Sequence, residues 1–185
     1  MYTMYYNKEN EFLIITSNIT FNEILRKNEG ENIYFYNEKE EIIGANIKIK
    51  LEKVGLIRYD DIKDLNIKVE LKEKIKNNNT NFKYGKIISY DEHPESTKLK
   101  VCKVNDGEEK QIICGAKNVE IGKIAIVAQI GTTMPNGKII NESKLLGVES
   151  YGMLCSLQEL GYNQEEPGIF LSNDENLVGM EFKGF

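Results

Sequence analysis

The chain has 185 residues, of which 41% are hydrophobic and 29% charged. It can therefore bury a core, and this composition excludes collagen-like, low-complexity and wholly disordered chains. No apolar run approaches the roughly 18 residues of a membrane helix, so we expect no membrane partner. The first ten residues lack the basic and apolar regions of a signal peptide, and the three cysteines are few and odd in number. We therefore expect a cytoplasmic protein with free thiols.

The net charge is −5 at pH 7, and it is unevenly distributed. Residues 1–81 carry 13 basic and 14 acidic side chains, whereas residues 82–185 carry 11 and 15. The strongly basic footprint that marks most nucleic-acid-binding proteins is absent. Because salt limits the reach of exposed charges to about 10 Å, a local cluster of lysines can still bind an anion.

A polar run, Lys76-Asn-Asn-Asn-Thr-Asn81, divides the chain. The residues before it predict a small α+β domain over 1–80. This part of the sequence contains no cysteine, histidine or glycine-rich loop that would indicate its function. β-branched and aromatic runs predict strands at Tyr2–Tyr6, Phe12–Thr16, Asn32–Tyr36 and Ile42–Ile49, the last two forming a hairpin. Helices are predicted at Phe21–Lys27 and Leu65–Lys76. The tyrosines of this half, at 2, 5, 6, 34 and 36, fit either the packing of a small sheet, which is favoured, or an RNA-stacking face.

After the break, short strands alternate with Gly, Pro and Asn turns, a pattern typical of a sandwich or a barrel. They are predicted at 83–90, 98–105, 109–114, 123–130, 138–141 and 144–148. A short helix is predicted at Ser156–Leu160, ended by Gly161.

Catalytic and metal motifs are poorly supported. The run from Gly131 to Lys138 has the wrong spacing for a phosphate-binding loop and contains a proline. Cys114, Cys155 and the single histidine, His93, form no paired zinc spacing. A hydrolase or metal enzyme built on these three residues is the weaker alternative. We therefore expect no catalytic residue, no metal and no cofactor.

An ordered set of short motifs covers the second half. These are His93-Pro-Glu-Ser-Thr-Lys-Leu99, Ile113-Cys-Gly-Ala-Lys-Asn118, Met134-Pro-Asn-Gly-Lys-Ile-Ile140 and Lys144-Leu-Leu-Gly-Val-Glu-Ser-Tyr-Gly-Met-Leu-Cys-Ser156. In this order and spacing they resemble the tRNA-binding OB domain. That domain occurs in the phenylalanyl-tRNA synthetase β subunit, in many bacterial methionyl-tRNA synthetases, and in EMAPII-like and CsaA-type proteins. A short chain with an unrelated domain in front is most similar to the YtpR-type tRNA-binding proteins.

The resemblance implies an all-β OB-fold barrel over 82–185 with a short capping helix, which binds folded tRNA and performs no chemistry. Beside it, the residues suggest how contact is made: cations and an amide for phosphate or ribose, hydroxyls that tolerate any base, and a methionine for an apolar face. The predicted RNA-binding residues are Lys86, Lys98, Lys117, Asn118, Lys144, Ser150, Met153 and Ser156. Gly115 and Gly152 suit sharp turns or close backbone approaches.

Structural alternatives exist for several of these residues. Met153 fits the barrel core as well as it fits a contact, Ser150 and Ser156 fit caps of turns, and His93-Pro94 is better explained as a shaped bend. Two departures from the family pattern matter: Leu146 stands where an arginine is common, and residues 82–185 contain no arginine. They leave open an alternative function as a protein-docking or chaperone-like module, with another protein or a second copy as partner.

Overall fold

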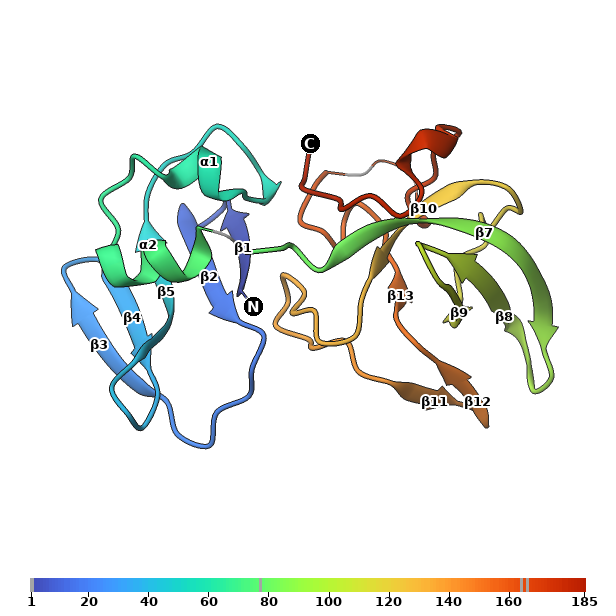
Figure 1. Ribbon diagram of the computed structural model, residues 1–185, viewed down its shortest axis with the longest axis horizontal. Coiled ribbons are helices and arrows are strands. Elements are labelled where there is room, and N and C mark those ends of the chain that lie inside the picture. Colours follow the sequence, from blue (N-terminus) through green and yellow to red (C-terminus); the bar gives the residue numbers. More distant parts are fainter. Residues whose placement is uncertain (1, 77, 164, 166) are drawn as a thin grey trace. The chain divides into compact units, whose positions relative to one another are not determined.

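The computed structural model describes residues 2–76, 78–163, 165 and 167–185. The chain forms two compact units (Figure 1). The first unit ends at Thr80 and also includes Lys183–Phe185, and the second spans Asn81–Phe182. The described residues are rich in β-strand and contain two short α-helices and one 3-10 helix. None of the helices in this described part is long and apolar enough to cross a membrane.

The first unit is built on a six-stranded antiparallel sheet, with strand order β3-β4-β5-β2-β1-β6. Its elements are β1 (Tyr2–Asn7), β2 (Phe12–Ser17), β3 (Leu25–Glu29), β4 (Asn32–Tyr36), β5 (Ile42–Lys48), β6 (Gly55–Leu56), α1 (Tyr59–Ile62) and α2 (Val69–Ile75). The pairing of β4 with β5 confirms the predicted hairpin. Alternate residues of each strand face opposite sides of a sheet, so one side can be buried under the helices.

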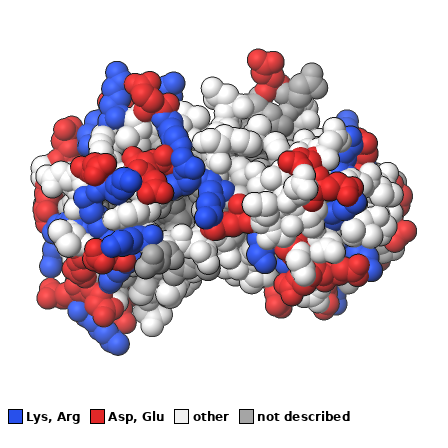
Figure 2. Space-filling model, turned by 45° about the horizontal axis from the view of Figure 1, so that its top comes forward, with Lys and Arg blue, Asp and Glu red and all other residues white. Residues whose placement is uncertain are grey.

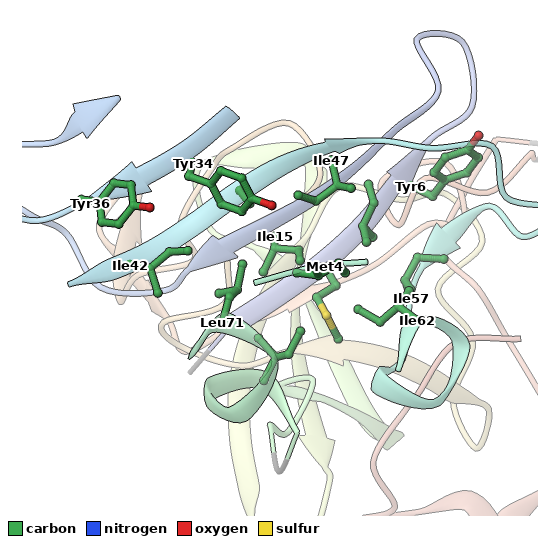
Figure 3. Close-up of a cluster of buried hydrophobic side chains, with 14 residues drawn as sticks. Met4, Tyr6, Ile15, Tyr34, Tyr36, Ile42, Ile47, Ile57, Ile62 and Leu71 are labelled. Carbon is green, nitrogen blue, oxygen red and sulfur yellow. The ribbon is translucent and has the colours of Figure 1, made fainter. Parts of the chain in front are cut away.

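The core of the first unit lies between one face of the sheet and the two helices (Figure 3). Leu13 and Ile15 of β2 point into it, and Ile62 of α1 and Leu71 of α2 close it from the other side. Tyr6, Tyr34 and Tyr36 belong to the same buried cluster. These tyrosines therefore pack the sheet, and the RNA-stacking interpretation is not supported for them.

Two helix predictions in this unit need correction. No helix forms at Phe21–Lys27, and the chain instead enters β3 at Leu25. All five residues of β3 are exposed, so its sequence lacks the apolar alternation that marks a half-buried strand, and only its pairing with β4 reveals it. The helix predicted at Leu65–Lys76 is shorter and spans Val69–Ile75.

The second unit contains a five-stranded antiparallel sheet with strand order β13-β10-β7-β8-β9. Its elements are β7 (Phe82–His93), β8 (Ser96–Asn105), β9 (Glu109–Cys114), β10 (Ile124–Ala128), β11 (Ser143–Leu145), β12 (Val148–Ser150), β13 (Met153–Leu154) and the 3-10 helix η1 (Glu175–Leu177). Strands β11 and β12 form a separate two-stranded hairpin. Strand pairing leaves β9 and β13 as the edges of the large sheet, so pairing alone does not close a barrel.

The predicted strands at 83–90, 98–105, 109–114 and 123–130 are confirmed as β7, β8, β9 and β10. The strand predicted at 138–141 is reduced to one isolated bridge, between Thr133 and Ile139. The strand predicted at 144–148 is a hairpin that turns at Leu146 and Gly147. No helix forms at Ser156–Leu160, where the chain makes a turn instead.

A buried ion pair lies where β8 turns into β9. Asp106 is fully buried, and its Oδ2 lies 3.0 Å from Lys110 Nζ and accepts a hydrogen bond of 2.7 Å from Gln129 Nε2. Lys110 Nζ also donates to Gln129 Oε1 at 2.8 Å. The three side chains tie the β8–β9 turn to the end of β10. A buried charge without its partner is destabilising, so the three side chains stabilise the turn only when all of them are present.

We expect Lys110→Met to destabilise the second unit by about 3–5 kcal/mol, because the buried Asp106 carboxylate loses its counter-charge. Lys103→Met is the matched control. Its ion pair with Glu109 spans 2.6 Å but both side chains are about half exposed, so its loss costs at most about 1 kcal/mol. Hydrogen exchange of the β8 and β9 amides, followed against urea, measures both variants. Equal losses in the two variants would contradict the assignment.

Candidate nucleic-acid interface

The β11–β12 hairpin carries Lys144 and two exposed leucines, Leu145 and Leu146, at its turn. Lys144 lies opposite Glu149, and Leu145 lies opposite Val148. The turn residues Leu146 and Gly147 both have positive φ values, +44° and +86°. A two-residue loop with positive φ at both positions matches the right-handed twist of the flanking strands.

The His93 side chain holds this hairpin through a hydrogen bond to the Leu145 carbonyl. Its ring is buried at the end of β7. The Glu95 backbone N–H donates to Nδ1 at 3.1 Å, so Nδ1 is an acceptor and the ring proton is on Nε2. Nε2 therefore donates to the Leu145 carbonyl, 3.0 Å away. The bend predicted at His93-Pro94 therefore also anchors a hairpin 52 residues away.

The segment 149–155 contains the edge strand β13 and contacts two other strands of the large sheet, β9 and β10. On the β9 side, the Tyr151 N–H donates to the Gln111 carbonyl at 2.9 Å, and Gln111 Nε2 donates to the Glu149 carbonyl at 2.7 Å. On the β10 side, Leu154 pairs with Val127, and the Cys155 N–H donates to the Ile126 carbonyl at 2.9 Å. One stretch of chain therefore contacts β9, at one edge of the sheet, and β10, next to the other edge.

Two of the predicted RNA-binding polar side chains, those of Ser150 and Asn118, form hydrogen bonds within the protein. Ser150 is only 2% exposed, and its Oγ accepts the Ile113 N–H at 3.0 Å. Asn118 donates to the Ile169 carbonyl at 2.8 Å and accepts the Ile169 N–H at 3.0 Å. Ser150 is therefore buried and the amide of the exposed Asn118 is paired within the protein, while contact of either residue with RNA stays a prediction.

Ser156 caps a turn rather than presenting a free hydroxyl. Its Oγ accepts the Glu159 N–H at 3.1 Å and donates to Glu159 Oε2 at 2.8 Å. The Ser156 N–H donates to the same carboxylate oxygen at 2.8 Å. This agrees with the predicted alternative that Ser156 caps a turn, and the sequence signal is a serine followed three residues later by a glutamate, the capping-box pattern.

The lysines divide into paired and unpaired groups. Lys86 lies 2.5 Å from Glu175 and is not available to a ligand without breaking that pair. Lys98, Lys117 and Lys144 are exposed, and no carboxylate of the described residues forms an ion pair with them. Figure 2 shows basic and acidic side chains interspersed on the visible face. The face seen in Figure 2 has no broad basic surface, so individual exposed lysines such as these three are the candidates for binding an anion.

The remaining candidates are Met153 and the thiols. Met153 is half-buried in β13 and lies outside the main core cluster of the second unit, a position compatible with either of its two predicted roles. Burial raises the pKa of Cys102 to about 12 and raises the pKa of Cys114 and Cys155. Such thiols hold their protons and are poor nucleophiles. Among the described residues, no three His, Cys, Asp or Glu side chains are arranged to hold a metal ion.

Comparison with known proteins defines the class to which this second unit belongs. Residues 82–180 match the family described as "Putative tRNA binding domain", and the chain belongs to that family. It is also 34% identical over 204 residues to the putative tRNA-binding protein YtpR of Bacillus subtilis, covering 97% of this chain and 98% of that protein. The predicted YtpR-type resemblance is therefore confirmed.

The same half of the chain is similar to part of a much longer enzyme subunit. It is 44% identical over 103 residues to the phenylalanine–tRNA ligase β subunit of Fusobacterium nucleatum, and 44% identical over 97 residues to that of Nitratidesulfovibrio vulgaris. These matches cover 55% and 51% of this chain but span only 13% and 12% of the two synthetase subunits.

Gly152 is the position in the segment 149–155 that tolerates no side chain. Its φ is +135°, and a Cβ there would lie 2.9 Å from the Ala128 carbonyl oxygen. We expect Gly152→Ala to cost at least roughly 1–3 kcal/mol in backbone strain alone, with faster hydrogen exchange in β9, β10 and β13. Gly115→Ala is the matched control, because its Cβ would lie 3.4 Å from a mobile Leu99 methyl group. A Gly152→Ala protein as stable as the control would contradict this assignment.

Proposed function

We propose that this protein binds structured tRNA through its second unit, by backbone and shape recognition, and catalyses no reaction. The observation that carries the proposal is the family match over 82–180, which spans the unit that presents Lys98, Lys117 and Lys144 to solvent. Phosphate contacts by lysine position a nucleic acid without reading its sequence. We infer a cytoplasmic location, because the proposed ligand, tRNA, is found there.

We further infer that the second unit is an OB-fold barrel closed by the segment 149–155. The sheet order β9-β8-β7-β10-β13 supplies a continuous ribbon of strands. The hydrogen bonds from Tyr151 to Gln111 and from Cys155 to Ile126 bring the last part of that ribbon against both β9 and β10. OB folds bind nucleic acids on one strand face and its flanking loops.

A non-catalytic role agrees with the chemistry of the described side chains. The three thiols are buried, and their raised pKa values disfavour thiolate formation. The single histidine has both ring nitrogens in internal hydrogen bonds. None of the groups that the enzyme alternative requires is therefore presented to a substrate.

The affinity should be modest and depend steeply on salt. The second half of the chain has no arginine, so it lacks the bidentate fork that binds phosphate most effectively. A few unpaired lysines within an acidic unit suggest a dissociation constant on the scale of non-specific binding, roughly 10⁻⁴–10⁻⁶ M. The bound RNA is recognised by its folded shape, because lysine–phosphate contacts carry no base specificity.

Charge reversal of the exposed lysines tests the proposal. We expect Lys98→Glu, Lys117→Glu and Lys144→Glu each to weaken binding of labelled bulk tRNA severalfold and to reduce the salt slope by about 1, because each removes one phosphate contact. Fluorescence anisotropy at about 50 and 200 mM salt measures the effect, with duplex DNA as a comparison ligand.

Lys8→Glu is the control, because Lys8 is an exposed lysine of the first unit and the change in net charge is identical. If Lys8→Glu weakens binding as much as the three test variants, binding follows net charge and not this surface. If the unaltered protein shows no tRNA binding at the lower salt concentration, the tRNA proposal fails and protein docking becomes the better explanation.

A further inference from the structure

The turn of the β11–β12 hairpin exposes an apolar tip that neither folding nor solubility explains. Leu145 is 39% exposed and Leu146 is 55% exposed. Leu146 also has a φ of +44°, in the left-handed region that Asn, Asp and Gly adopt most readily. Hairpin loops of this type strongly favour Asn-Gly, Asp-Gly or Gly-Gly. Leucine is therefore unfavourable at this position both for the backbone and for the exposed side chain.

The backbone of the tip is held in place by hydrogen bonds to the rest of the second unit. His93 Nε2 donates to the Leu145 carbonyl at 3.0 Å, and three residue pairs join β11 to β12. Gln111 Nε2 donates to the carbonyl of Glu149, which ties the returning strand to β9 at 2.7 Å. A strained residue that its surroundings hold in place is a common feature of binding sites. A preordered tip also loses little conformational entropy on binding.

The charges around the tip indicate which part of an RNA it meets. Lys144 is exposed on β11, but Glu142 and Glu149 are exposed beside it. The Tyr151 hydroxyl donates to the Glu149 carboxylate at 2.5 Å and leaves its negative charge in place. These carboxylates repel phosphate, whereas the apolar face of a nucleobase carries no net charge. Apolar side chains, leucine included, pack against or between bases in several kinds of protein–nucleic acid complex.

We propose that Leu146 packs against an exposed nucleobase face of the bound tRNA. This inference rests on the proposed function, and it assigns to the tip an apolar contact in addition to the lysine–phosphate contacts. Sequence-specific and shape-specific RNA recognition both use unstacked bases in loops and at helix ends. Because the contact is apolar, its contribution to affinity is nearly independent of salt, unlike that of Lys144.

Leu146→Asn separates binding from folding. Asparagine suits the left-handed turn position, so hydrogen-exchange protection of the hairpin should stay the same or rise. Binding of labelled bulk tRNA should weaken about tenfold, by the same factor at about 50 and 200 mM salt. Ile121→Asn is the matched control, since Ile121 is also 55% exposed and also precedes a glycine of positive φ, Gly122 at +88°. Its tRNA affinity should not change.

Three outcomes overturn the inference while leaving tRNA binding intact: equal affinity of Leu146→Asn and the unaltered protein, an equal loss in Ile121→Asn, or a loss that disappears at the higher salt concentration. Sedimentation of each variant is measured alongside. A change in oligomeric state in Leu146→Asn would assign the tip to contact with a second copy and overturn the RNA contact. Failure of the unaltered protein to bind tRNA is a separate result, which removes the proposed function itself.

Discussion

The second unit depends on one short run of backbone, from Glu149 to Cys155, that contacts β9 on one side and β10 on the other. A seven-residue segment can do this only if it bends sharply between the two contacts. Gly152 supplies the bend, with a φ of +135° and no room for a Cβ. This segment also positions the elements on either side of it. The β11–β12 hairpin ends within the segment, at Ser150, and the Ser156 turn follows it directly. The candidate interface is therefore placed by this backbone constraint together with the side-chain hydrogen bonds of His93, Gln111 and Ser150.

The strands of this unit could be predicted because their signal is local. β7, β8 and β9 are runs that contain β-branched or aromatic residues, and Gly107 marks the turn between β8 and β9. β3 in the first unit shows the opposite case. Its residues, Leu25-Arg-Lys-Asn-Glu29, are all exposed, and a polar edge strand resembles a surface helix in a single sequence. The same charges have a physical function there, because charged side chains discourage pairing of an open sheet edge with another chain.

The candidate site was predictable in residue type but not in placement. Serine, asparagine and lysine are suitable for binding RNA, and each is equally suitable for completing internal hydrogen bonds. Ser150 bonds to Ile113, 37 residues away, and Asn118 bonds to Ile169, 51 residues away. No periodicity links such positions, so a single sequence cannot distinguish a ligand contact from an internal partner. The capping pattern of Ser156 and Glu159 is the exception, because both residues lie within one turn.

The acidic side chains of the second unit have to be considered together with the lysines that form ion pairs with them. Much of the negative charge is placed beside specific lysines: Asp106 beside Lys110, Glu109 beside Lys103, and Glu175 beside Lys86. Within each pair the two opposite charges largely cancel, so the pair contributes little to the electrostatic field that a ligand meets at short range. Beyond about 10 Å salt screens the remainder, so the net charge of −4 over residues 82–185 repels RNA less than its value alone suggests. An RNA surface on such a unit has to combine a few unpaired lysines with uncharged contacts, and the exposed apolar tip at Leu146 is where an uncharged contact is available.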